Sequence, residues 1–333
     1  RRNARGLLRS VTTDTPTPSP TLNDEATPKL STLDRLLPVW IGSAMVGGIL
    51  LGRLIPDLND TLDKVKVDTV SLPIAIGLLA MMYPVLAKVR YRGISAELGD
   101  RRTMGLSLVL NWVVGPALMF TLAWVFLGDL PELRTGLIIV GLARCIAMVL
   151  IWNDLACGNS ELGAVLVAVN SVFQIVMYTV LGWFYLDLLP GWLGLETQSL
   201  DVGMWPIAKS VLIFLGIPLV AGFLTRTILE ARKGTDWYEH SFLPRIGPIA
   251  LYGLLFTIVV LFSLQGDQIL DRPLDVARVA VPLLIYFTLM WFGSFGAGYR
   301  LGLPYDRNTS VAFTAAGNNF ELGIAVAIAV FGV

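Results

Sequence analysis

Nine stretches of this chain are dominated by apolar residues, with short polar or charged segments between them. They cover residues 36–55, 70–88, 103–127, 135–156, 162–189, 205–226, 245–265, 278–299 and 308–333. Each is close to the roughly 20 residues that a helix needs to cross a bilayer. Because isolated strands could not satisfy their backbone polar groups in lipid, the pattern predicts an all-α membrane protein.

Residues 1–33 follow a different pattern, being rich in Thr, Pro, Ser and Arg without an apolar period. Such a composition is typical of a disordered segment. We therefore expect a disordered cytoplasmic tail over 1–33 and a transmembrane transporter domain over 34–333.

The composition supports insertion in a membrane. Hydrophobic residues make up 55% of the chain, charged residues 15%, and the mean hydropathy is +0.68. A typical soluble domain has about 25% charged residues. The low share of charged residues therefore indicates that the chain is surrounded by membrane lipid. The formal net charge of zero argues against nucleic acid as a partner.

Basic residues set the expected orientation, because cytoplasmic loops of membrane proteins are enriched in Lys and Arg. They gather in the tail and in the loops after the second and sixth segments, "KVRYRGISAELGDRR" and "RTILEARKGTDWYEHSFLPR". The N-terminus is therefore expected on the cytoplasmic side. The membrane is expected to be the bacterial cell membrane, with a vacuolar membrane as the alternative.

The number of segments suggests two halves. Five segments lie within residues 36–189 and four within 205–333, and the chain ends inside the apolar run "IAVAIAVFGV". A tenth segment, missing from this chain, would complete two five-helix repeats. Because five is odd, these repeats would be inverted, as in many secondary transporters.

Two segments carry polar residues at mid-membrane depth, and they hold corresponding positions in the two halves. The fourth contains Arg144 and Cys145, and the ninth contains Asn318, Asn319 and Glu321. Binding sites in inverted-repeat transporters are formed by such interrupted helices. We therefore predict two crossed, discontinuous helices at these segments, with the transport site between them.

The charged residues of these segments need a reason to be in the membrane. A carboxylate such as Glu321 is costly there and by default functional, as a proton site or as the partner of a cation. Burial should raise its pKa, which suits proton exchange. Arg144 has two readings of equal weight, contact with the solute or an internal charge that holds the two broken helices together.

The cysteines and amides permit less definite predictions. A buried cysteine such as Cys145 is most often a small apolar residue. Cys157 lies twelve residues later, about 18 Å along a continuous helix, so the two thiols could bind one ion only if the helix were sharply broken. Asn111, Asn170 and Gln174 are expected to form hydrogen bonds between helices.

Other functions leave few traces in the sequence. His240 is the single histidine, which argues against a histidine metal site, and no cofactor is expected. The segments contain no Ser–His pair or HExxH motif, so an enzyme is not expected. A sodium-coupled carrier of organic anions on the same fold is one alternative, and a membrane receptor or channel is another.

The interrupted segments also carry a family resemblance. "RTGLIIVGLARCIAMVLIWNDLACG" and "SVAFTAAGNNFELGIAVAIAVFG" resemble the signature segments of the arsenical-resistance-3 arsenite efflux permeases, and the likeness extends over about residues 34–333. It implies ten helices, cytoplasmic termini and the fold of the bile acid/arsenite/riboflavin transporter superfamily. Gly323 stands where the family pattern has alanine.

The resemblance also implies a function, export of trivalent arsenic by proton antiport. It implies that Cys145 and Glu321 are essential. From the residues themselves we expect Cys145 to bind arsenic, Glu321 to couple protons, and Arg144, Asn318 and Asn319 to complete the substrate site. A thiol is a soft ligand that suits thiophilic arsenic, and a single thiol would permit release. Arsenite is therefore the expected substrate, together with protons, and antimonite is a second candidate.

Overall fold

A computed structural model describes residues 36–55, 66–67, 70–89, 99–146, 148–195, 204–320 and 323. The tail and Glu321 lie outside the described residues. The described chain is helical, apart from the short antiparallel strands β1 (Lys66–Val67) and β2 (Val70–Ser71). The prediction of a helical membrane protein is confirmed, because six of the described helical stretches have the length and apolar composition needed to cross a bilayer.

The helices follow the order of the apolar segments, and several predicted segments contain two helices joined by a π-helical turn (η). The order is α2 (Leu37–Leu54), α4 (Leu72–Ala87), α6 (Arg101–Val109), η2 (Leu110–Val114), α7 (Gly115–Leu127), α8 (Pro131–Leu142), α9 (Met148–Leu155), α10 (Ser160–Trp183), η3 (Phe184–Leu188), α11 (Leu189–Trp192), α12 (Met204–Val211), η4 (Leu212–Gly216), α13 (Ile217–Lys233), α14 (Thr235–Trp237), η5 (Tyr238–Phe242), α15 (Leu243–Asp271), α16 (Pro273–Arg300) and α17 (Tyr305–Ala316).

The four π turns share one sequence feature, a proline two residues after the turn. These are Pro116, Pro190, Pro218 and Pro244. A proline inside a helix lacks the N–H for the usual hydrogen bond and collides with the carbonyl four residues before it. A wider turn relieves that collision, and the helix continues without a break.

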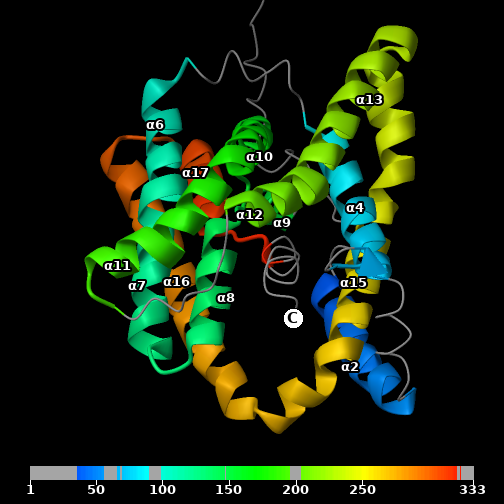
Figure 1. The fold of residues 1–333 in the computed structure, drawn as a ribbon. Coiled ribbons are helices and arrows are strands. Elements are labelled where there is room, and N and C mark those ends of the chain that lie inside the picture. Colours follow the sequence, from blue (N-terminus) through cyan, green and yellow to red (C-terminus); the bar gives the residue numbers. More distant parts are fainter. Residues whose placement is uncertain are drawn as a thin grey trace, which may run out of the picture.

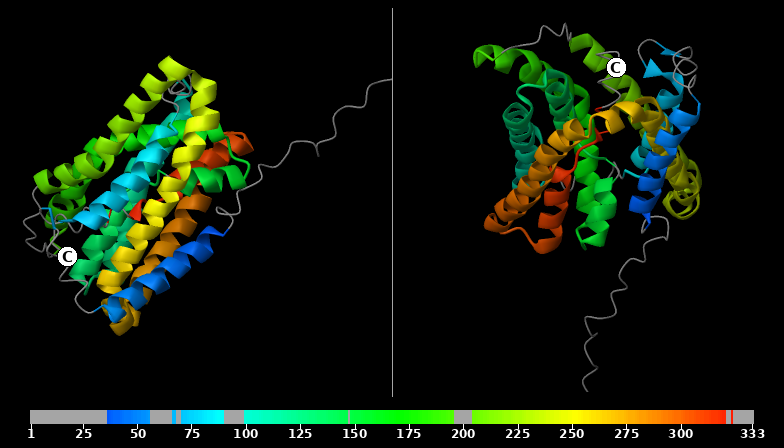
Figure 2. Two further views of the ribbon diagram at one scale, coloured as in Figure 1. Left: turned by 90° about the vertical axis from the view of Figure 1, so that its right-hand side faces the viewer. Right: turned by 90° about the horizontal axis from the view of Figure 1, so that it is seen from below.

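The helices form two groups, seen in Figure 1 and from two further directions in Figure 2. In the first, which we call the panel, α15 packs against α2 and α4, and α13 packs against α4. In the second, the bundle, α7 packs against α8 and α16, while α17 packs against α16 and α10. The panel helices approach closely at Gly222, where an added Cβ would lie 2.8 Å from the backbone N of Ala87.

One predicted segment connects the two groups. Its first helix, α12, packs against α10 of the bundle, and its second helix, α13, packs against α4 of the panel. The π turn η4 lies between them. A change in the angle between panel and bundle would therefore bend this segment near η4.

Candidate functional site

The fourth apolar segment is interrupted at the predicted place. Helix α8 ends at Leu142, α9 begins at Met148, and Ala143 has extended backbone angles of φ −81° and ψ 118°. Arg144 and Cys145 lie in this connection. The polar residues in the sequence therefore mark a real break in the helix.

The ninth segment is interrupted too. Helix α17 ends at Ala316, and Gly317 is extended with φ −75° and ψ 134°. Asn318 forms an isolated antiparallel bridge with Arg144, so the two breaks lie against each other. The predicted meeting of two interrupted helices is thus observed in the described part of both segments.

Main-chain hydrogen bonds join the two breaks. The N–H of Cys145 donates to the carbonyl oxygen of Gly317 over 3.1 Å, and the N–H of Asn319 donates to that of Ala143 over 3.0 Å. Backbone groups released by a broken helix are costly in lipid unless another partner satisfies them. Here each break supplies partners for the other.

Arg144 is completely buried at this junction. Its Nη2 donates to the carbonyl oxygen of Gly141, near the end of α8, and its Nη1 lies 3.5 Å from that of Ala315, near the end of α17. The C-terminal end of a helix carries partial negative charge, which favours a cation. The guanidinium therefore caps both half-helices, which favours the structural reading of this residue over contact with the solute.

Two neighbours complete the surroundings of Arg144. Its Nη1 donates to the hydroxyl of Tyr286 over 3.0 Å, and its backbone N–H donates to Oε1 of Gln174 over 2.7 Å. The Tyr286 hydroxyl in turn donates to Oδ1 of Asn318 over 3.4 Å. One tyrosine on α16 thus connects the side chains of both breaks.

A glycine makes room for this arrangement. A Cβ on Gly115, the first residue of α7, would lie 2.9 Å from Nη1 of Arg144 and 3.0 Å from the Tyr286 hydroxyl. Neither Gly115 nor Tyr286 was predicted as a site residue. Both stand within apolar segments, and nothing in the sequence distinguishes them from the other glycines and tyrosines of such segments.

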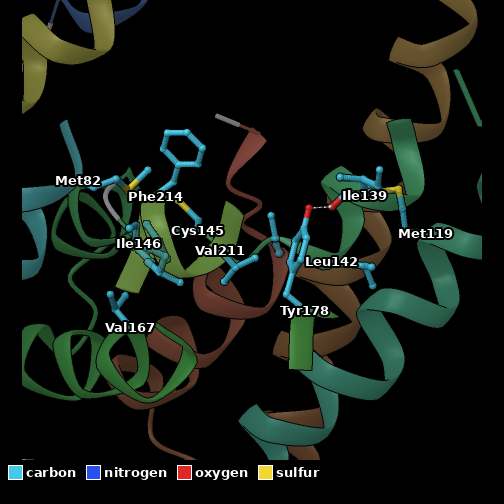
Figure 3. Packing of buried hydrophobic residues seen from close by; sticks show 14 of the residues in the cluster. Met82, Met119, Ile139, Leu142, Cys145, Ile146, Val167, Tyr178, Val211 and Phe214 are labelled. Atoms are coloured by element: carbon cyan, nitrogen blue, oxygen red, sulfur yellow. Dashed lines mark hydrogen bonds between the residues drawn. The ribbon is translucent and has the colours of Figure 1, made fainter. Parts of the chain in front are cut away.

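Cys145 is 8% exposed, and its side chain lies beside the break in the ninth segment. A Cβ on Gly317 would lie 2.8 Å from the Cβ of Cys145. Cys145 belongs to the same buried cluster as Met82 of the panel helix α4 and Phe214 of η4, and Figure 3 draws the three side chains near one another. The thiol therefore lies among apolar side chains from the bundle and from the panel.

Cys157 is separate from this site. It is exposed, has a left-handed backbone with φ 53°, and follows the eight-residue helix α9. That helix alone places about 12 Å between its two ends. The break in the segment does not bring the two thiols together as a chelating pair.

The buried amides have different partners. Oδ1 of Asn170 accepts a hydrogen bond from the indole Nε1 of Trp112 over 3.2 Å, so the expected bond between helices is confirmed there. Gln174 bonds instead to the non-helical connection that holds Arg144. For Asn111 the expectation is wrong, because its Nδ2 donates to the carbonyl of Ser107 in its own helical stretch. An amide in a helical stretch can bond back to that stretch, and the sequence does not distinguish the two cases.

A second polar cluster fixes the start of α17 against the bundle. The Ser310 hydroxyl donates to Oδ1 of Asn153 over 2.8 Å, and Nδ2 of Asn159 donates to Oδ2 of Asp306 over 3.0 Å. Asn159 also caps α10 by accepting from the N–H of Leu162. The cluster connects α9, α10 and α17 and thereby supports both interrupted segments.

The described residues contain no group of three His, Cys, Asp or Glu side chains that could hold a metal ion. Most polar atoms at the junction are backbone groups, amides and hydroxyls. The arrangement can therefore present one soft sulfur and several neutral hydrogen-bonding groups to a small solute within the membrane.

Comparison with known proteins agrees with this architecture. Residues 75–272 match the Sodium Bile acid symporter family. The chain is 59% identical over 304 residues to the arsenical-resistance protein Acr3 of Corynebacterium glutamicum, covering 91% of this chain and 82% of that protein. It is 31% identical over 309 residues to Acr3 of Alkaliphilus metalliredigens, covering 90% and 84%.

An uncharacterized transporter of Synechocystis is 36% identical over 322 residues, covering 91% of this chain and 82% of that protein. Long similarity to two arsenical-resistance proteins, together with the family match, is consistent with the membrane helices of the structure. The chain therefore belongs to the Acr3 arsenical-resistance transporters within the Sodium Bile acid symporter family.

Proposed function

We propose that this protein exports arsenite across the cell membrane and thereby confers arsenic resistance. The observation that carries the proposal is the position of Cys145, a nearly buried thiol on the main-chain junction of two interrupted helices. Two relatives named as arsenical-resistance proteins support it. Antimonite, which shares the soft character of trivalent arsenic, is a second candidate substrate.

The chemistry at Cys145 is an exchange of ligands without oxidation or reduction. The sulfur of the thiol bonds to the arsenic of arsenous acid, one arsenic–oxygen bond breaks, and the thiol proton leaves with that oxygen as water. Thiol sulfur selects a soft centre over sodium or water. With one sulfur ligand, hydrolysis reverses the step and releases the solute.

Coupling to protons is proposed to reside in Glu321, two residues after Asn319. A carboxyl group within a membrane segment can exchange a proton between the two sides of the membrane. In the proposed antiport, two inverted five-helix repeats build the fold, and the site opens alternately to cytoplasm and exterior. Separation of panel and bundle, with bending at η4, supplies a route for this change.

Arg144 has a supporting role in this proposal. Its guanidinium donates to carbonyls at the ends of α8 and α17 and to Tyr286. Asn318 and Asn319 are proposed to bind the hydroxyl groups of arsenous acid through their side chains. Both lie at the break, and Asn319 is 2% exposed.

A sodium-coupled carrier of organic anions is the second candidate, favoured by the family match at residues 75–272. Such a carrier requires oxygen ligands for sodium near the broken helices. The cluster around Asn153 and Ser310 offers amide and hydroxyl oxygens, but Oδ1 of Asn153 already accepts from Ser310. Transport that requires sodium rather than a pH gradient would favour this alternative.

Everted membrane vesicles test the proposal directly, because an exporter carries arsenite into them. Wild-type vesicles are expected to accumulate arsenite when a pH gradient is imposed, with or without sodium. Cys145→Ser should abolish accumulation, whereas Cys157→Ser, the matched control, should retain it. Undiminished accumulation by Cys145→Ser would refute the role of this thiol.

The same vesicles test the proton site. Glu321→Gln keeps the size of the side chain but cannot exchange a proton. Its arsenite flux is expected to become independent of the imposed pH gradient. Retained dependence on the gradient would contradict the proposed coupling role.

A further inference from the structure

A second sulfur atom lies at the junction of the broken helices, and it comes from the opposite helix group. Sδ of Met82, on α4 of the panel, is 4.0 Å from Nδ2 of Asn319, in the bundle. Met82 is 4% exposed and lies in the 16-residue helix α4. The sulfur therefore occupies the boundary between the two groups.

The main chain places the residue that contacts Met82 in the neighbourhood of Cys145. The N–H of Asn319 bonds to the carbonyl of Ala143, and the N–H of Cys145 bonds to Gly317. The residue that meets the Met82 sulfur is thus paired with the residue two positions before Cys145. Met82, Cys145 and Phe214 belong to one buried apolar cluster, and their side chains appear near one another in the view of Figure 3.

We propose that Met82 is a specificity-determining residue whose thioether contacts the arsenic bound at Cys145. The inference rests on the proposed function and names the second group that recognises the solute. Thioethers, like thiols, are soft and polarizable ligands. Being uncharged, the thioether adds selectivity for a soft centre without adding charge to the site.

The origin of this sulfur in the panel has a mechanical consequence. Cys145 belongs to the bundle, so the two sulfurs separate whenever panel and bundle move apart. The solute then loses one of its two soft contacts while the bond to Cys145 persists. Opening of the transporter would therefore weaken binding and favour release.

The first test compares two methionines of the same helix. Met82→Leu replaces the sulfur with carbon at similar volume, and Met81→Leu is the matched control, since Met81 is also 4% exposed. Met81 lies where α4 approaches α15 within the panel, because an added Cβ on Gly253 of α15 would lie 2.8 Å from the backbone N of Met81. Met82→Leu is expected to raise the KM for arsenite in everted vesicles about three- to tenfold, with maximal rate unchanged, and Met81→Leu to leave KM unchanged.

The second test is a gain of affinity, which misfolding cannot produce. In Met82→Cys, two thiols face one arsenic atom, so two arsenic–sulfur bonds form, two arsenic–oxygen bonds break and two waters leave. Purified Met82→Cys is expected to bind arsenite at least about tenfold more tightly than wild type, and to turn over more slowly. Met81→Cys should bind as wild type does.

The outcomes separate this inference from the proposed function. An unchanged KM in Met82→Leu, or an unchanged arsenite affinity in Met82→Cys, overturns the role of Met82 and means that it only fills space. If Met82→Leu does not accumulate in the membrane, the affinity of Met82→Cys decides. Absence of arsenite transport by wild type would overturn the proposed function itself, and the inference with it.

Discussion

The Nη1 atom of Arg144 and the hydroxyl oxygen of Tyr286 lie 3.0 Å apart, and both side chains are completely buried. This contact joins the connection between α8 and α9 to helix α16. Because the same hydroxyl donates to Asn318, it also reaches the other break. Tyr286 therefore positions the side chains of both interrupted segments, and its removal should affect transport more than a tyrosine elsewhere.

Tyr286→Phe tests this positioning role. The change leaves Arg144 without one acceptor and Asn318 without one donor, each a buried polar group whose loss of a partner costs about 1–3 kcal/mol. We expect arsenite transport in vesicles to fall at least about tenfold. The KM and maximal rate, measured separately, show whether binding or turnover is impaired.

The control for Tyr286→Phe is Tyr178→Phe. The Tyr178 hydroxyl is also buried and donates to the carbonyl of Ile139 on α8 over 3.0 Å, a bond that includes no residue of either break (Figure 3). Both variants should lower the melting temperature in detergent by a similar amount, and only Tyr286→Phe should impair transport. Equal transport by the two variants would show that Tyr286 only stabilises the fold.

Arg144→Lys tests whether the guanidinium caps two helices at once. Arginine presents several donors in a planar fork, whereas lysine has a single compact ammonium group. Lysine therefore cannot serve Gly141, Ala315 and Tyr286 together, and we expect loss of transport and a lower melting temperature. Full transport by Arg144→Lys would mean that positive charge alone is sufficient at this position.

Gly317→Ala tests the close approach of the two breaks. The added Cβ would lie 2.8 Å from the Cβ of Cys145, closer than side chains pack, so the thiol must shift. Overpacking of this kind costs about 1–3 kcal/mol. We expect reduced arsenite transport, whereas Gly293→Ala, where an added Cβ meets nothing within 4 Å, should behave as wild type.

The N-terminus of α6 offers a test of stability that is separate from transport. Asp100 accepts from the backbone N–H and the hydroxyl of Thr103 and forms an ion pair of 3.0 Å with Arg307. Replacing such a capping residue with alanine costs about 1 kcal/mol. Asp100→Ala should therefore lower the melting temperature of the purified protein without altering the KM for arsenite.

The same carboxylate predicts a pH dependence. Hydrogen bonds from Thr103, together with the charge of Arg307, lower the pKa of Asp100. A group whose pKa is lower in the folded state stabilises the protein above its pKa in the unfolded chain, and this contribution is lost as the pH falls through the lowered value. Melting curves should show less destabilisation by Asp100→Ala in acid than at neutral pH, and an equal effect at both would contradict this.

Much of the junction could be predicted from sequence because membrane insertion leaves few explanations for a polar residue. Arg144 and the Gly317–Asn319 run interrupt otherwise apolar segments, and corresponding positions in two halves suggested that they meet. Their contact is made by the backbone, which follows from the need of broken helices for partners. The inverted repeat itself and the role of Glu321 stay predictions.

Other site residues have no such mark. Met82, Tyr286 and Gly115 stand within apolar segments, where a methionine, a tyrosine or a glycine is unremarkable in composition. Their importance comes from which neighbour each one faces, and that depends on the packing of helices far apart in the chain. The partner of Asn111 could not be predicted because an amide can bond back to its own helical stretch or across to another helix, and the sequence does not distinguish the two.

The junction of the two breaks is joined by main-chain atoms, through the bonds Cys145–Gly317 and Asn319–Ala143. These bonds do not involve the side chain at position 145. The scaffold is therefore separable from its chemistry, and changes at Cys145 and Met82 could redirect it to other cargo while the helices stay in place. Selection for exporters of new metalloids should begin with libraries at these two codons.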